Sequence, residues 1–469
     1  MGNSQKIVVK NFGPIEFAEI DLKKTIVIIG EQASGKSTIA KIIYFYKSLR
    51  DDLFSQVFSK STPDSKDYDI RTAFVFEARD KFKELFGSTS FSKDTEITFY
   101  FQEKPIANHL RFFTQKNNKI ECEPSPNFFT TQFEDEINIV FESLKSIRNE
   151  TSFWKKLFSS ESSLNQKLLS LVNDALGIYH TDSLFVIAGR YASVSYPEFF
   201  ERLYSSIESK IGEQQTKNNA SFDEVLMLRF MDWVIETKNK IKEESIIYNS
   251  VFKGTTSKTL EKYEKHELNS IPHISIMTKM FPIMKGYYFI DGEQEKILLP
   301  NSDKAILLSH TSSGQQAVIR ILQDAFSLIQ DGGHKIVFRI IEEPEVHLFP
   351  TAQKKIIELL ASMVNLNDKN QLVITTHSPY ILMVFNNLLY AKQVFDATGE
   401  TKTIPVESHI SSGDFCAYKL KNTQNGKFVL ESIMDNGLIG SNLLDEASED
   451  LGQDFDGLYE VYGDYLQSN

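Results

Sequence analysis

Residues 30–38 read Gly-Glu-Gln-Ala-Ser-Gly-Lys-Ser-Thr, which is a complete phosphate-binding loop. The apolar run 26–29 predicts a buried strand before the loop, and the pattern of residues 36–48 predicts a helix after it. The two glycines let backbone N–H groups face an anion, and the helix turns its positive end toward the same point. This context predicts an α/β fold with a site for ATP and Mg²⁺. We expect the nucleotide to contact Gly30, Ala33, Ser34, Gly35, Lys36, Ser37 and Thr38.

The first polar residues of that helix have separate expected roles. Lys36 is long enough to reach the β- and γ-phosphates, and we count it among the catalytic residues. The Ser37 hydroxyl is expected to hold Mg²⁺.

Bulk composition limits the class of protein. The chain has 469 residues and a net charge of −12, which argues against general attraction to nucleic acid. No apolar run reaches the length of a membrane span, and no signal-peptide pattern opens the sequence. The only cysteines, Cys122 and Cys416, have no metal-ligand spacing. We therefore expect a cytoplasmic protein with no membrane partner.

A second chemical motif follows another apolar strand. Residues 340–345 read Ile-Ile-Glu-Glu-Pro-Glu, so two carboxylates are presented where that strand ends. In a parallel sheet this end lies beside a phosphate-binding loop. We expect Glu342 to bind Mg²⁺ and Glu343 to orient or deprotonate the attacking water, because one carboxylate cannot fill both roles.

A histidine is presented at the end of the next predicted strand. Residues 375–379 read Thr-Thr-His-Ser-Pro. An imidazole at that point is expected to contact the γ-phosphate, so His377 is predicted to take part in catalysis.

A third segment, residues 311–316, reads Thr-Ser-Ser-Gly-Gln-Gln before a predicted helix. Small residues before a helix form an anion site without a lysine, which makes Ser312, Ser313, Gly314 and Gln315 candidate nucleotide contacts. A second anion site in a chain with one phosphate-binding loop suggests a two-fold dimer or higher homo-oligomer that holds ATP between subunits. The alternative is that Ser312 or Ser313 simply caps the helix.

The remaining sequence predicts the organisation of the chain. We expect strands at 6–10, 18–22, 70–77, 95–102, 183–188, 335–341 and 371–375, helices over 131–177, 195–270, 312–330 and 350–364, and a hairpin at 417–433 around Asn425-Gly426. The polar stretch 103–130 contains many turn residues. These patterns divide the chain into an N-terminal ATPase lobe (1–130), a helical insertion or arm with its own strand (131–285), a C-terminal ATPase lobe (286–435) and an acidic helical tail (436–469). We expect a mixed or parallel sheet with an antiparallel subdomain and the helical insertion.

Together these motifs resemble the heads of ABC-type ATPases of the SMC-like and OLD-like group, within the AAA family. Residues 342–350 and 375–379 resemble the bacterial OLD-type ATPases most. The resemblance implies Walker A at Lys36 and Ser37, a signature loop at 312–315, Walker B at Glu342 and Glu343, and a switch histidine at His377. It leaves Gln102 and Arg190 as candidates for the Q-loop residue, with the Arg190 region preferred.

The resemblance also implies a biological role. About 80 residues follow the helix after His377, which are too few for the Toprim nuclease domain of full-length OLD proteins. We therefore expect an ATPase that regulates a separate nuclease or toxin, similar to the ATPases of the Septu, PARIS and retron-associated antiphage systems. The alternative is a DNA repair or recombination ATPase that clamps nucleic acid through a basic groove on residues 51–290.

Overall fold

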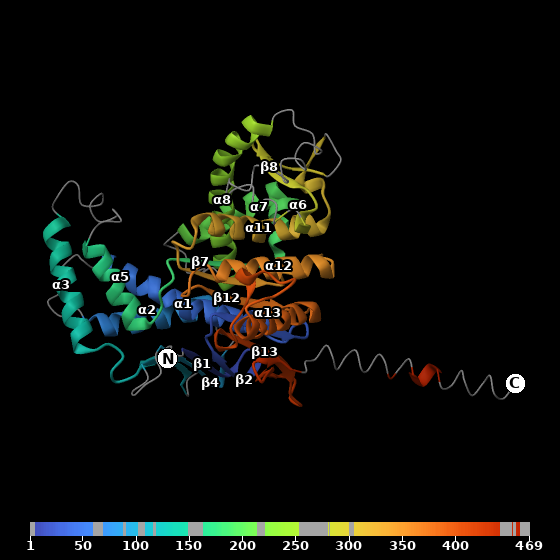
Figure 1. Cartoon of the computed structure of the whole chain (residues 1–469). Coiled ribbons are helices and arrows are strands. Elements are labelled where there is room, and N and C mark those ends of the chain that lie inside the picture. Colours follow the sequence, from blue (N-terminus) through green and yellow to red (C-terminus); the bar gives the residue numbers. More distant parts are fainter. Residues whose placement is uncertain are drawn as a thin grey trace.

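The computed structural model describes residues 5–59, 69–87, 91–101, 108–115, 119–148, 163–212, 221–252, 280, 282–299, 304–440, 453 and 456–459. One large sheet runs through the molecule, with the strand order β6-β5-β4-β1-β2-β14-β13-β3-β12-β11-β7. Figure 1 labels β4, β1, β2, β13, β12 and β7 of this sheet. The predicted α/β class with a mixed sheet is confirmed.

The half of the sheet that carries the motifs is parallel. Its strands are β13 (Phe415–Asn422), β3 (Thr25–Gly30), β12 (Gln371–Thr376), β11 (Val337–Glu342) and β7 (Asp182–Val186). Strands β3 and β11 are buried along their whole length, which explains their mostly apolar sequences, and the one buried arginine of β11, Arg339, is paired with Asp182 and Asp324.

The other half of the sheet is antiparallel. It consists of β1 (Lys6–Phe12), β2 (Ile15–Asp21), β4 (Phe91–Tyr100), β5 (His109–Thr114) and β6 (Ile120–Pro124). Strand β14 (Phe428–Ser432) joins the halves, since it pairs with both β13 and β2. A separate antiparallel sheet contains β8 (Tyr287–Asp291), β9 (Gln294–Leu298) and β10 (Ala305–Leu307), and a two-stranded ribbon contains β15 (Met434–Asp435) and β16 (Leu438–Ile439).

Two hydrophobic cores cover the opposite faces of this sheet. Within β3, Ile26 and Ile28 belong to one core, whereas Val27 and Ile29 belong to the other. The first core is packed mainly by α1 (Lys36–Ser59), α2 (Ile70–Phe86), α3 (Thr131–Arg148) and α5 (Ser163–Leu176). The second is packed by α7 (Pro197–Gly212), α8 (Phe222–Phe252), α11 (Ser313–Asp331), α12 (Pro350–Val364) and α13 (Pro379–Thr398). Between β7 and α7 lie the short helices η2 (Ala188–Tyr191) and α6 (Ala192–Ser195).

One local prediction in the N-terminal part is wrong. Residues 70–77 form the start of helix α2, not a strand, because Ile70, Phe74, Ala78 and Phe82 recur every four residues on one buried face. The Asp69 side chain caps this helix by accepting a hydrogen bond from the backbone N–H of Arg71. The polar stretch 103–130 contains the strand pair β5–β6.

The hairpin at 417–433 is present, but its turn differs from the prediction. Asn425-Gly426 is not the pair of central turn residues. The N–H of Gly426 donates to the carbonyl of Thr423, and Thr423 pairs with Lys427. Gly426 therefore follows the turn in a left-handed conformation, which gives a three-residue loop.

Three of the predicted domains contribute strands to the same sheet. Strands from the first lobe, strand β7 from the insertion and strands from the second lobe all lie in the large sheet. The domain boundaries themselves stay a prediction. Of the predicted helical tail, residues 436–440 form a turn and strand β16 rather than a helix, Gln453 and residues 456–459 are helical, and the other residues lie outside the described part of the chain.

Candidate nucleotide site

Three neighbouring parallel strands bring the main predicted residues to one edge of the sheet. Ile29 of β3 lies opposite Thr376 of β12, and Thr375 lies opposite Glu342 of β11. The segments that follow these strand ends carry Lys36, His377 and Glu343. Ligands bind at the carboxyl ends of such strands, so this edge is the candidate functional site.

The phosphate-binding loop has the backbone that its sequence predicts. Gly35 has a φ of +102°, and a Cβ there would lie 2.6 Å from a side-chain carbon of Ile15. Ala33 is also left-handed, and the buried Ser34 hydroxyl makes no hydrogen bond to a described group. These left-handed conformations turn the loop tightly before α1, as a loop whose N–H groups bind an anion requires.

Lys36 bends back over its own loop. Its Nζ donates to the carbonyls of Gly30 at 2.9 Å and Glu31 at 2.8 Å. Burial lowers the Lys36 pKa, while the carboxylates of Glu343, Glu345 and Glu342 oppose that change. The ammonium group is thus held beside the loop, in the field of the acidic motif.

Glu342 has the surroundings of a metal ligand. Its Oε2 accepts the Ala188 N–H at 3.2 Å, and its buried Oε1 makes no hydrogen bond to a described group. Burial raises its pKa, and the nearby Ser37 hydroxyl opposes the rise. A buried carboxylate oxygen without a partner costs free energy that a cation would recover. Glu342 and the exposed Ser37 therefore fit the Mg²⁺ that accompanies ATP.

Glu343 and His377 face each other. The Nε2 atom of His377 lies 3.4 Å from Oε1 of Glu343, and both side chains are about one-third exposed. Glu343 has a φ of +45°, which is uncommon for a residue with a side chain. Its N–H donates to the Thr375 carbonyl at 2.8 Å, which connects this bend to β12.

Glu345 supports this pair and was not among the predicted site residues. Its Oε1 accepts hydrogen bonds from the Thr376 hydroxyl at 2.7 Å and from the His377 N–H at 2.8 Å. It therefore fixes the backbone that presents His377. The signal available in the sequence was the third acidic residue of the 342–345 motif.

The segment at 312–315 begins α11 as a capped helix. Ser312 and Gln315 form a complete capping box, and Gln315 also donates to the Met284 carbonyl at 2.7 Å. A Cβ on Gly314 would lie 2.6 Å from the His347 carbonyl oxygen. Within the described part of the chain, no hydrogen bond joins this segment to residues 30–38. The structure thus shows the helix cap directly, and the nucleotide contacts of Ser312, Ser313, Gly314 and Gln315 stay a prediction.

Arg190, one of the two Q-loop candidates, lies in direct contact with the acidic motif. It is fully buried in η2 and donates to the carbonyls of Glu342 at 2.7 Å and Glu343 at 2.9 Å. Its guanidinium thus contacts the backbone of the motif, while the other Q-loop candidate, Gln102, lies outside the described residues.

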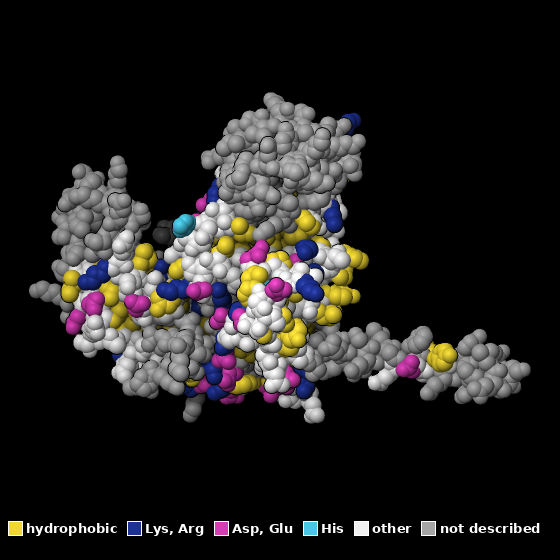
Figure 2. All heavy atoms as spheres, viewed as in Figure 1, with side chains coloured by type: hydrophobic (Ala, Val, Ile, Leu, Met, Phe, Trp, Pro, Cys, Tyr) yellow, Lys and Arg dark blue, Asp and Glu magenta, His cyan; other side chains and the backbone are white. Residues whose placement is uncertain are grey.

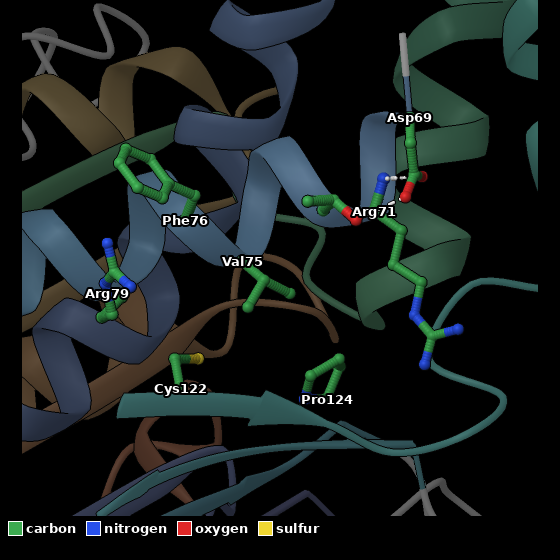
Figure 3. Close-up of a pocket in the computed structure, with 8 residues that line it drawn as sticks. Asp69, Arg71, Val75, Phe76, Arg79, Cys122 and Pro124 are labelled. Atoms are coloured by element: carbon green, nitrogen blue, oxygen red, sulfur yellow. Dashed lines mark hydrogen bonds between the residues drawn. The ribbon is translucent and has the colours of Figure 1, made fainter. Parts of the chain in front are cut away.

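A separate hollow lies away from these residues. It has a volume of about 370 Å³ and lies between α2 and the edge strand β6, lined by Asp69, Arg71, Thr72, Val75, Phe76, Arg79, Cys122 and Pro124 (Figure 3). None of the predicted nucleotide contacts lines it.

Fold and site together define a phosphate-binding-loop protein with a paired acidic motif. The chain belongs to the AAA ATPase domain family (AAA_15), which residues 5–382 match. No curated protein matched the sequence. Among the described residues, no helix is long and apolar enough to cross a membrane.

The structure is similar to SMC head domains at low sequence identity. One is an SMC head bound to the C-winged helix domain of ScpA, with 11% identity, a TM-score of 0.42, and coverage of 93% of this chain and 98% of that chain. Another is the head from Thermotoga maritima, with 10% identity, a TM-score of 0.36, and coverage of 92% and 100%. A third, derived from Pyrococcus furiosus, has an extended coiled coil and is bound to the C-terminal domain of ScpA. Its identity is 11%, its TM-score 0.39, and its coverage 97% and 99%.

Proposed function

We propose that this protein binds and hydrolyses ATP at the site formed by Lys36, Ser37, Glu342, Glu343 and His377. The observation that carries the proposal is that three adjacent parallel strands place these five residues at one edge of the sheet. A phosphate-binding loop, a buried carboxylate and a second, solvent-accessible carboxylate are the parts that phosphoryl transfer to water needs.

Each side chain has a distinct part in the proposed reaction. Lys36 leaves its contacts with the Gly30 and Glu31 carbonyls and donates to the β- and γ-phosphates. Glu343 orients the attacking water and accepts its proton, and His377 contacts the γ-phosphate. Ser37 and Glu342 would hold Mg²⁺, which neutralises charge on the phosphates when bound.

We further propose that two subunits enclose ATP, with residues 312–315 of one subunit facing the phosphate-binding loop of the other. The support is that residues 312–315 contact His347 and Met284, and that no hydrogen bond among the described residues joins them to residues 30–38. Hydrophobic side chains also gather at the right-hand edge of the molecule over α12 and α13 (Figure 2). The exposed large hydrophobic residues on these two helices or at their ends are Phe349, Tyr380, Met383 and Tyr390. An apolar surface beside the site suits an assembly between copies.

Substitution of Glu343 by Gln tests the proposed chemistry. Removal of a positioned base typically costs about 10²–10⁴ in rate, so Glu343→Gln is expected to bind ATP while losing that much hydrolysis. Phosphate release and binding of a fluorescent ATP analogue, both with Mg²⁺, measure the two effects. The matched control is Glu293→Gln, an exposed glutamate in the β8–β9 turn. Hydrolysis by Glu343→Gln near the unsubstituted rate would show that the base is assigned wrongly.

We propose that the assembly regulates a separate nuclease or toxin in antiphage defence. The support is the resemblance of residues 342–350 and 375–379 to OLD-type ATPases. Tagged Glu343→Gln protein, expressed from its native locus, tests this by affinity purification and mass spectrometry. A stoichiometric, neighbour-encoded protein is the expected result. Bound DNA that salt removes, with no protein partner, would favour a nucleic-acid clamp.

A further inference from the structure

Arg190 connects three parts of the molecule that are far apart in sequence. Its Nε donates to the Ala317 carbonyl of α11 at 2.7 Å. Its two terminal nitrogens donate to the carbonyls of Glu342 and Glu343, and one also donates to Ile187 at 3.3 Å. A single side chain therefore connects the end of β7, the acidic motif and the first turns of α11.

The partners of Arg190 differ from those of the other fully buried arginines. Arg320 forms an ion pair with Glu295, and Arg339 pairs with Asp324 and Asp182. The hydrogen bonds of Arg190 all go to backbone carbonyls. Burial lowers its pKa to about 10, and the nearby Glu345 carboxylate is the largest opposing influence, so it stays charged near neutral pH. A charge buried without a direct carboxylate partner is costly unless its donors are satisfied, so these carbonyls must stay in place around it.

The backbone that Arg190 holds is the strained part of the site. Glu343 has a φ of +45°, a conformation that a residue with a side chain keeps only where surrounding contacts enforce it. Its N–H is held by Thr375 and its carbonyl by Arg190. With both sides of the residue fixed, its carboxylate is directed toward His377.

We propose that Arg190 is a positioning residue that holds Glu343 in its catalytic orientation and couples it to the placement of α11. The proposal rests on the ATP hydrolysis proposed above. A shift of the α11 N-terminus, such as contact with a nucleotide would cause, would be transmitted through Ala317 and Arg190 to the Glu343 backbone.

Conservative substitution of Arg190 separates positioning from binding. A misplacement of about 1 Å in a catalytic group costs about 10²-fold, so Arg190→Lys should lower kcat by about 10- to 100-fold. The Kd for the fluorescent ATP analogue should change by less than about threefold, since the phosphate-binding loop is untouched. The matched control is Arg50→Lys, which alters a buried arginine of α1 whose hydrogen bonds go to Asn173 and Asp51 rather than to α11 or the acidic motif. Its kcat should stay close to the unsubstituted value.

A double-substitution cycle asks whether Arg190 acts through Glu343. In the Glu343→Gln background, Arg190→Lys should cause little further loss in single-turnover rate, because its effect has already been removed. Equal losses in both backgrounds, or an unchanged kcat in Arg190→Lys, would overturn the proposal.

Two further outcomes are informative. Arg190→Gln is the second variant, and it should likewise lower kcat while leaving the Kd for the ATP analogue nearly unchanged. If both variants lose the folded state by circular dichroism, Arg190 is a structural residue and the proposal is wrong. If the unsubstituted protein binds ATP without hydrolysing it, the proposed function fails first, and the positioning role fails with it.

Discussion

Lys47 should make the stability of the protein increase with pH above neutrality. It lies within the phosphate-binding-loop helix α1, completely buried, and its Nζ donates to Gln5 Oε1 at 2.7 Å. Burial lowers its pKa from 10.5 to about 7. Between these two values the unfolded chain binds a proton that the folded protein does not, so the free energy of unfolding rises with pH.

The size of the effect follows from the two pKa values. Integrated from pH 7 to pH 8.5, the proton difference for Lys47 corresponds to about 2 kcal/mol of added stability. Two other buried groups with large pKa shifts change their contribution outside this window. The His180 pKa is lowered to about 3, so its contribution rises with pH only below about pH 6.5. The pKa of the Cys416 thiol is raised by burial to about 12, so it lowers stability only at higher pH, where the unfolded thiol ionises and the folded one does not.

The assay is urea unfolding of the unsubstituted protein and Lys47→Met at pH 7.0 and 8.5. We expect Lys47→Met to lose most of the pH-dependent gain, because methionine fills similar volume without a proton to release. Lys354→Met, on the exposed side of α12, is the control and should keep the gain. An equal gain in the unsubstituted protein and Lys47→Met would refute the reasoning.

Two further substitutions test the geometry of the site. Gly314→Ala places a Cβ 2.6 Å from the His347 carbonyl oxygen and should destabilise the protein by about 1–3 kcal/mol in urea unfolding, whereas an unchanged stability would show that the two segments separate freely. Ala188→Pro removes the N–H that contacts Glu342 at the first position of η2, where proline fits because Ile187 is extended. It should raise the Mg²⁺ concentration needed for half-maximal hydrolysis. It should also raise the pH at which activity appears on the acid side of the pH profile. Unchanged values of both would show that the Ala188 N–H has no part in metal binding.

The parallel strands could be predicted because their sequences report burial on both faces. The runs before Gly30, Glu342 and Thr376 are short and mostly apolar, with Arg339 interrupting the second, and the structure shows strands at each of them. The segment 70–77 was harder, since four of its eight residues are apolar enough for a strand. Its helix becomes clear only over the longer span to Phe86, where a four-residue repeat emerges.

The contacts that organise the site depend on residues distant in sequence. The hydrogen bonds of Arg190 reach Ala317, Glu342 and Glu343, which lie 127, 152 and 153 positions further along the chain. No local pattern encodes such a pairing. The positive φ of Glu343 is equally invisible in the sequence, because a glutamate adopts it only when surrounding contacts enforce it.

The sequence by itself determined the chemistry of this protein: the loop at 30–38, the paired carboxylates after one strand and the histidine after another. These signals are local, because strand burial, loop curvature and helix starts depend on neighbouring residues. The tertiary structure alone decided that β3, β12 and β11 are adjacent, that Glu342 is buried with an unpaired oxygen, and that Arg190 holds the acidic motif to α11. Those features arise from packing between segments distant in sequence, because burial makes an unpaired polar or charged side chain costly in free energy.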